Sequence, residues 1–164
     1  GAASVLLASE AWAEKRNIPV QAYLTHSEVA AVDFHSQGKK SEGLLMAPAY
    51  AVPRLLDKAG LTPQDFGFYE IHEAFAAQVL CTLKAWESED FCTSKLGLSK
   101  ALGSIDRSKL NVKGSSVATG HPFAATGARI LATLAKILQQ NGGGRGLISI
   151  CAAGGQGVTA IVEA

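Results

Sequence analysis

The sequence has few cysteines, almost no excess of charge and no long apolar run. Its three cysteines, Cys81, Cys92 and Cys151, are sparse, odd in number and without metal-ligand spacing, so neither a disulfide framework nor a metal site is predicted. Lys plus Arg (15) nearly balances Asp plus Glu (14), and no basic stripe carries interleaved aromatic side chains. This balance argues against nucleic acid as a partner.

Membrane and secretory signals are also lacking. No apolar run reaches the ~18 residues of a membrane span, and residues 1–7 lack the basic region of a signal peptide. We therefore expect no membrane span and a reducing compartment, the cytoplasm. The apolar run at residues 3–8 predicts a buried strand at the very start of the sequence, which indicates that the natural polypeptide extends further upstream.

The 164 residues, 48% of them apolar, predict one compact α/β domain with a sizeable core. The spacing of the apolar residues predicts strands that alternate with helices. Predicted strands cover residues 20–32, 66–71, 110–119, 147–150 and 158–162, and predicted helices cover residues 9–16, 48–59, 75–86 and a segment after Pro122. The last two strands are expected to pair as an antiparallel hairpin, segment 87–109 to hold one short helix, and residues 38–43 to form a surface turn.

Three reactive side chains, His72, His121 and Cys151, each follow a predicted strand. Consecutive strand-helix-strand units cross over right-handedly, so their strands run parallel and their carboxyl ends share one edge of the sheet. Open α/β sheets bind ligands at that edge. The three side chains are therefore expected to meet in one crevice.

Small residues surround two of these side chains. Residues 152–154 (Ala-Ala-Gly) let a substrate approach the backbone after Cys151, and consecutive N–H groups in a glycine-rich turn can face an anion. His121 precedes a predicted helix whose amino-terminal dipole favours negative charge. Such donors are expected to lower the pKa of Cys151 toward neutrality. Two chemistries on a carbonyl compound then stay open: Cys151 as a nucleophile activated by His121, as in a cysteine hydrolase, or Cys151 as an acid/base that moves a proton at carbon.

Three motifs carry a family resemblance. Residues 72–76 (His-Glu-Ala-Phe-Ala), 120–129 (Gly-His-Pro-Phe-Ala-Ala-Thr-Gly-Ala-Arg) and 151–157 (Cys-Ala-Ala-Gly-Gly-Gln-Gly) resemble, in order and spacing, the three carboxyl-half signatures of thiolases. Residues 1–7 resemble the strand with which the second part of a thiolase opens, so the resemblance covers almost the whole chain. His at the start of the first motif is similar to the subgroup that includes the β-subunits of fatty-acid oxidation complexes, whereas many thiolases have Asn there.

The resemblance implies cleavage of a 3-ketoacyl-CoA by CoA to acetyl-CoA and a shortened acyl-CoA, or the reverse Claisen condensation, with CoA as a substrate and no permanently bound cofactor. His121 would activate the nucleophilic cysteine and help bind the thioester oxygen, and Cys151 would remove or return the proton at the α-carbon. His72 would orient a water in an oxyanion hole, and the backbone N–H of Ala153 would be a further oxyanion donor. Ala124 and Ala153 stand where many members have Gly, and the His-type subgroup tolerates both changes.

The implied fold is an α/β thiolase-like half, βαβαβαββ, with a five-stranded mixed sheet layered with helices and the amino-terminal half missing. Residues 1–16 would be the last strand and exit helix of the amino-terminal domain, and residues 17–164 the carboxyl-terminal domain. The nucleophile would lie in the missing half, so this chain alone would be inactive. A homodimer, a homotetramer or a subunit of a β-oxidation complex is implied. Two alternatives stay open: a non-catalytic acyl-CoA- or lipid-binding thiolase relative, and a condensing enzyme similar to 3-ketoacyl synthases.

Overall fold

The computed structural model describes residues 1–36 and 41–164, so residues 38–40 of the predicted surface turn lie outside the described part. Within the described residues, helices alternate with strands, and none of these helices is both long and apolar enough to cross a bilayer. In chain order the elements are α1 (Glu10–Glu14), β1 (Tyr23–Ala31), α2 (Ala47–Ala59), β2 (Phe68–Ile71), α3 (Ala76–Glu87), α4 (Glu89–Ser94), the 3-10 turn η2 (Arg107–Lys109), α5 (Ser116–Thr119), α6 (Thr126–Gln140), β3 (Arg145–Ala152) and β4 (Gln156–Glu163).

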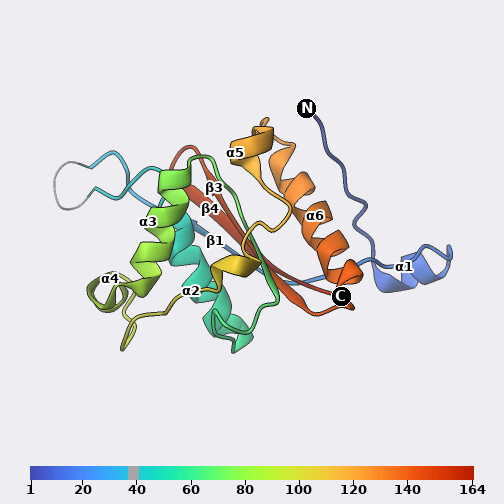
Figure 1. Cartoon of the computed structure of the whole chain (residues 1–164), viewed down its shortest axis with the longest axis horizontal. Helices are drawn as coiled ribbons and strands as arrows, with labels where there is room; N and C mark the ends of the chain where they lie inside the picture. The colour runs from blue at the N-terminus through green and yellow to red at the C-terminus, as the bar shows by residue number, and fades with distance from the viewer. Residues whose placement is uncertain (37–40) are drawn as a thin grey trace.

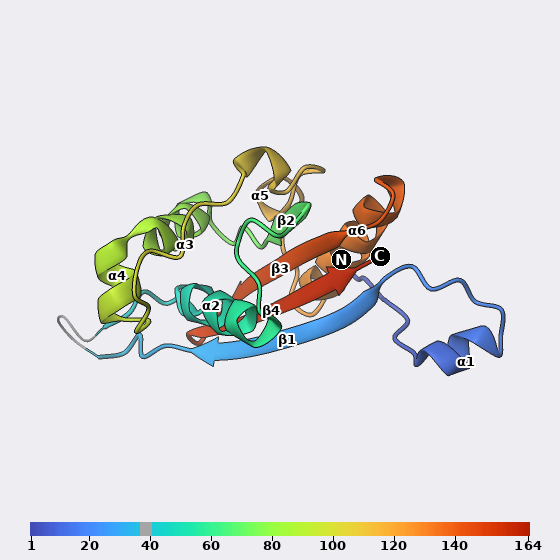
Figure 2. The same cartoon turned by 90° about the horizontal axis from the view of Figure 1, so that it is seen from below.

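The strands form one mixed sheet in the order β1-β4-β3-β2. β2 and β3 run parallel, with Ile71 opposite Ser149. β4 pairs antiparallel with both β3 and β1. The predicted antiparallel hairpin is therefore confirmed, and the carboxyl ends of β2 and β3 lie at the same edge of the sheet, close to α5 (Figure 2).

Helices cover both faces of this sheet (Figure 1). On one face, a core cluster joins Leu55 of α2 and Trp86 of α3 with Tyr69 of β2. On the other face, Leu134 of α6 belongs to a second cluster with Ile148 of β3. Because successive strand residues point to opposite faces, β2 and β3 contribute alternately to the two clusters. The result is a sheet between two helical layers, buried on both sides.

Helix α2 confirms the helix predicted at residues 48–59. Pro48 lies in its first turn and Gly60, with φ 66°, ends it. The helix lies so close to the sheet that a Cβ atom on Gly157 of β4 would be 2.7 Å from the backbone nitrogen of Pro48. Gly157 pairs with Cys151 of β3, so a glycine is needed directly beside a candidate site residue.

The strand predicted at residues 3–8 is wrong. These residues belong to no described helix or strand, and Leu6 and Leu7 are 69% and 67% exposed. An apolar run becomes a strand only where a sheet edge pairs with its backbone, and no strand of the described sheet pairs with this segment. The helix predicted after it is confirmed as α1, capped by the Ser9 side chain, and Figure 1 and Figure 2 both place it away from the sheet.

The mixed α/β sheet is confirmed, but it has four strands in the described residues instead of the five expected. The strand predicted at residues 110–119 is reduced to a single parallel bridge from Leu110 to Tyr69, at the outer edge of β2. The next residue, Asn111, has φ 48°, which ends the extended conformation. Further along, Ser116–Thr119 form helix α5.

The Asn111 side chain takes the place of the missing strand. Its Oδ1 accepts a hydrogen bond from the N–H of Ile71 at 2.9 Å, and its Nδ2 donates to the carbonyl of Ile71 at 2.9 Å. Its own N–H donates to the carbonyl of Tyr69 at 2.9 Å. A side-chain amide offers the same donor and acceptor as a peptide group, so Asn111 satisfies the buried edge of β2 just before His72.

We expect Asn111→Ala to lower the free energy of unfolding by roughly 3 kcal/mol, because it leaves both polar groups of Ile71 unpaired and buried. Asn17→Ala is the matched control, since Asn17 also has a positive φ (53°) but lies on the surface. The control should lose only about 1 kcal/mol, the cost of alanine in the left-handed region. Urea unfolding measures both, and equal losses would mean that backbone strain alone explains the role of Asn111.

Candidate active site

His72 lies directly after β2 and is held by three other segments. Its side chain is 5% exposed, and its N–H donates to the carbonyl of Ser149 in β3 at 2.8 Å. Its Nδ1 lies 2.9 Å from Oγ of Ser116 in α5. Ser116 Oγ also accepts a hydrogen bond from Nη2 of Arg129 in α6 at 2.9 Å. The imidazole therefore has one orientation, fixed from the side of α5 and α6.

His72 is neutral at pH 7. Burial lowers its pKa to about 4, and the neighbouring His121 and the guanidinium of Arg129 act in the same direction. Glu73 opposes the shift but does not outweigh it. A neutral imidazole in a fixed orientation can donate one hydrogen bond to a substrate oxygen without bringing a charge into the site.

His121 lies in an exposed loop that joins α5 to α6. It follows a helix, not the strand predicted from the sequence, because the chain leaves the extended conformation at Asn111. Its ring centroid is 5.2 Å from that of His72, with an angle of 68° between the rings. The structure thus brings together two histidines that lie 49 positions apart in the sequence.

Cys151 is the last residue but one of β3 and is 4% exposed. Burial raises its pKa to about 11, although the backbone N–H groups of Cys151 itself and of Ala74 oppose the rise. The expected lowering of this pKa is therefore wrong, because the loss of hydration outweighs the nearby donors. At pH 7 the group is a neutral thiol, suited to give a proton to a carbanion. The Ala74 contact places it beside the loop that follows His72.

Ala153 lies in the exposed turn between β3 and β4. Its φ is not positive, as an alanine with an unstrained backbone requires. Among the described residues, no backbone hydrogen bond from its N–H is found outside the helices and strands. Ala124, the other alanine found where a glycine was expected, has φ 63° and so occupies the left-handed region that glycine prefers.

Several polar residues that support these groups were not predicted from the sequence. The Glu73 carboxylate accepts hydrogen bonds from Nδ2 of Asn111 at 2.7 Å and from the N–H of Val117 at 3.2 Å, which ties α5 to the end of β2. Glu73 and Arg129 lie inside the motifs at residues 72–76 and 120–129, so the motifs themselves could have indicated both residues. Ser116 gave no such indication, because it lies in a segment predicted as a strand.

Glu70 was also missed. It lies on β2 two residues before His72 and therefore on the same face of the strand. It is 1% exposed, and neither of its carboxylate oxygens has a hydrogen-bond partner among the described residues. Burial raises its pKa to about 7, with Arg129 opposing the rise and Glu73 adding to it. Under mildly acidic conditions Glu70 therefore holds a proton while His72 does not.

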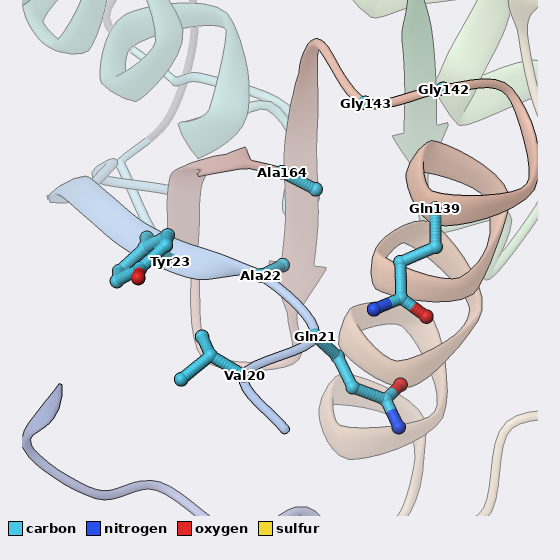
Figure 3. A pocket seen from close by; sticks show the side chains of 8 residues that line it. All are labelled: Val20, Gln21, Ala22, Tyr23, Gln139, Gly142, Gly143 and Ala164. Atoms are coloured by element: carbon cyan, nitrogen blue, oxygen red, sulfur yellow. The ribbon is translucent and has the colours of Figure 1, made fainter. Parts of the chain in front are cut away.

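A cavity of about 520 Å³ lies elsewhere (Figure 3). Gln139, Gly142 and Gly143, at the carboxyl end of α6, line it, whereas His121 precedes the amino end of that helix. The 15 residues of α6 span roughly 22 Å, so this cavity is distant from the histidines. Of the described residues that line it, none is a histidine, a cysteine or a charged side chain. It offers no group for the chemistry considered above.

Comparison with known sequences gives a consistent result. A family model described as "Thiolase, C-terminal domain" matches residues 25–164. A 3-ketoacyl-CoA thiolase of Yersinia pestis (strain Pestoides F) is 45% identical over 163 residues, which cover 99% of this chain and 36% of that protein. One from Yersinia pseudotuberculosis serotype O:1b gives the same values. The chain therefore spans little more than a third of the length of these relatives.

Solved structures agree. A crystal structure of the Bacillus anthracis acetyl-CoA acetyltransferase superposes with a TM-score of 0.72 at 34% identity, covering 94% of this chain and 33% of that one. A crystal structure of human mitochondrial 3-ketoacyl-CoA thiolase gives a TM-score of 0.73 at 32% identity, covering 96% of this chain and 34% of that one. The fold described above is thus also found within these two proteins.

The buried pair Glu70 and His72 makes opposite contributions to the pH dependence of stability. Glu70 has a raised pKa of about 7 against the ordinary 4.5, so its contribution is full below pH 4.5 and is lost as the pH rises through 7. His72 has a lowered pKa of about 4 against 6.5, so its contribution is full above pH 6.5 and is lost as the pH falls through 4.

We therefore expect Glu70→Gln to gain up to roughly 3 kcal/mol of unfolding free energy relative to the unsubstituted protein as the pH rises from 4.5 to above 7. His72→Asn should show the reverse and gain as the pH falls from 6.5 to 4. Urea unfolding between pH 4 and 8 measures both differences. Curves for the two variants that run parallel to that of the unsubstituted protein would show that neither group is perturbed as described.

Proposed function

Because the chain belongs to the thiolase family, as a carboxyl-terminal domain, we propose that it supplies the acid/base and oxyanion groups of an acyltransferase that cleaves 3-ketoacyl-CoA with CoA. The products would be acetyl-CoA and a shortened acyl-CoA, and the reverse reaction would be a Claisen condensation. The observation that carries the proposal is the neutral, buried thiol of Cys151, at the sheet edge where His72 and His121 meet. CoA is a substrate in this proposal, and no permanently bound cofactor is required.

The nucleophilic cysteine is assigned to an amino-terminal half outside this chain. In support, the chain covers 36% of a related 3-ketoacyl-CoA thiolase, so most of that protein has no counterpart here. Three apolar side chains close to the site residues in sequence are widely exposed, Phe75 and Val117 at 64% and Phe123 at 90%, as expected of a face that another part of the enzyme or the substrate covers. We also assign residues 1–16 to that half, since the family match begins after them.

The proton transfers centre on Cys151. In cleavage, the nucleophilic cysteine attacks the C3 carbonyl carbon of the substrate, and the C2–C3 bond breaks with its electron pair going to C2. Cys151 gives its Sγ proton to C2, which releases acetyl-CoA. It then takes a proton from the CoA thiol, whose sulfur attacks the acyl-enzyme; the bond between the acyl carbon and the nucleophilic cysteine breaks, which releases the shortened acyl-CoA and frees that cysteine. A thiol that is neutral at pH 7 is the form that the first of these steps needs.

The other groups stabilise negative charge on oxygen. His72, held neutral, donates a hydrogen bond toward the thioester oxygen through an oriented water. The backbone N–H of Ala153 would be a second donor, on the turn that follows Cys151. His121, in the exposed loop 5.2 Å from His72, would activate the nucleophile and help bind the thioester oxygen. A fixed donor aimed at such an oxygen is worth about 3 kcal/mol of barrier.

On the same family grounds, we propose that the complete enzyme is a cytoplasmic homodimer or homotetramer, or the thiolase subunit of a β-oxidation complex. In this proposal both halves of each site belong to one polypeptide, so the active species should elute at the mass of two or four complete copies or of a larger complex, and an active monomer would contradict the assembly. Gel filtration of the complete enzyme with activity measured across the peak checks this assignment.

We expect Cys151→Ser in the complete enzyme to slow cleavage of 3-ketoacyl-CoA by roughly a thousandfold, because a serine hydroxyl is too weak an acid to exchange the proton. Acylation of the nucleophile by an acyl-CoA, followed by intact mass, should stay detectable. Cys81→Ser is the control, since Cys81 is an exposed free thiol on α3, and it should keep the full rate.

Full cleavage activity in the Cys151→Ser enzyme would remove Cys151 from the mechanism. Acyl-CoA binding without any turnover in the unsubstituted enzyme would favour the non-catalytic relative. Turnover only with acyl carrier protein donors would favour a 3-ketoacyl synthase-like enzyme.

A further inference from the structure

We propose that Arg129, acting through Ser116, fixes the tautomer of His72 so that Nε2 carries the hydrogen and is the donor side of the ring. This inference rests on the proposed function, in which His72 donates a hydrogen bond toward the thioester oxygen. Arg129 and Ser116 are positioning residues in this scheme, because they act only through His72.

The hydrogen bond between Arg129 of α6 and Ser116 of α5 can have only one direction. An arginine guanidinium has donors only and stays charged at every pH of interest. Nη2 of Arg129, 2.9 Å from Ser116 Oγ, must therefore donate, and Ser116 must accept. The hydroxyl hydrogen of Ser116 is left to find an acceptor of its own.

The hydroxyl hydrogen of Ser116 has one available acceptor among the described residues, Nδ1 of His72. Ser116 is 3% exposed, and within the described part of the chain its Oγ contacts only Nη2 of Arg129 and Nδ1 of His72. If Nδ1 carried a hydrogen, the Ser116 hydroxyl would be buried without an acceptor, which is costly. With Nδ1 as the acceptor, the Ser116 hydroxyl both accepts from Arg129 and donates to His72, and no hydrogen of Ser116 is left unpaired. In a neutral imidazole the hydrogen must then be on Nε2.

The charged groups around His72 favour the same arrangement. His121 and Arg129 both disfavour a second proton on the ring, and Glu73, which favours one, is engaged by Asn111 and Val117. Glu70, on the same face of β2, lies near enough to Arg129 for its pKa to be affected by that charge. The charge of Arg129 thus acts on both the buried carboxyl group of Glu70 and the imidazole of His72.

The tautomer matters because the two ring nitrogens present opposite dipoles. An Nε2–H donates toward the water and the developing negative charge, whereas a lone pair at Nε2 would repel that charge. An asparagine at this position, as the resemblance describes for many thiolases, offers an amide donor that has no tautomers. Dependence on Ser116 should therefore be specific to a histidine at position 72.

A double-mutant cycle in the complete enzyme tests this specificity. We expect Ser116→Ala to lower kcat about tenfold when residue 72 is His, with KM nearly unchanged, because one hydrogen bond that selects the tautomer is lost. Ser116→Thr, which keeps the hydroxyl, should restore kcat. In the His72→Asn background, Ser116→Ala should change kcat by less than about twofold. An equal loss in both backgrounds, or no loss when residue 72 is His, would overturn the proposal.

A measurement that does not need turnover separates this proposal from the proposed function. In enzyme labelled with ¹⁵N-histidine, the imidazole nitrogens of His72 are assigned by their absence in His72→Asn. We expect a protonated Nε2 and an unprotonated Nδ1, and a mixture of both tautomers after Ser116→Ala. Hydrogen on Nδ1 in the unsubstituted enzyme would overturn the tautomer assignment even if the enzyme cleaves 3-ketoacyl-CoA. The expected tautomer in an enzyme without thiolase activity would instead contradict the proposed function and leave the assignment supported.

Discussion

The site depends on how the chain is held as it leaves β2. Asn111 pairs with both polar groups of Ile71 in place of a fifth strand, and its Nδ2 also reaches Glu73. Glu73 in turn accepts from the N–H of Val117, next to Ser116. One amide and one carboxylate therefore position the end of the strand that carries His72 and the start of the segment that leads to His121. Each of these bonds is modest by itself, but loss of the two bonds from Asn111 to Ile71 would leave buried polar groups without a partner.

Burial then decides the charge of His72 and of Cys151. At pH 6 a solvated imidazole would be partly protonated, whereas buried His72 is neutral because its pKa is about 4. Cys151, with a pKa of about 11, keeps its thiol proton well above pH 7. Glu70, on the same face as His72, tends to stay protonated in acid. A site whose donors are neutral can receive a substrate that develops negative charge without repelling it, and low local polarity strengthens each hydrogen bond to that charge.

Much of the fold could be predicted from the sequence because its cues are local. The apolar spacing of α6, the Gly60 stop after α2 and the glycine-rich turn between β3 and β4 each appear where expected. The wrong strand predictions concern two segments whose conformation depends on whether another strand pairs with them. Residues 3–8 have strand-like composition but no partner strand, and residues 110–119 are interrupted by a positive φ at Asn111 that a side-chain hydrogen-bond network supports.

The candidate site likewise has features that local sequence indicates and features that depend on contacts between distant segments. Of the candidates proposed from the sequence, His72 and Cys151 lie at the carboxyl ends of β2 and β3 as expected, because the order of the elements encodes position at a sheet edge, whereas His121 follows α5 instead of a strand. The supporting residues and the raised pKa of Cys151 were not predictable, because they depend on which side chains from α5, α6 and β2 approach one another and on how much water each loses.

The central claim is that this chain supplies the proton-transferring cysteine while the acyl group is carried elsewhere. The most direct test is to quench the complete enzyme during turnover of a 3-ketoacyl-CoA and to map the acylated peptide by mass spectrometry. The account predicts an acyl group on a cysteine outside this chain, with Cys81, Cys92 and Cys151 unmodified. An acyl group on Cys151 would contradict the account and would make Cys151 the nucleophile.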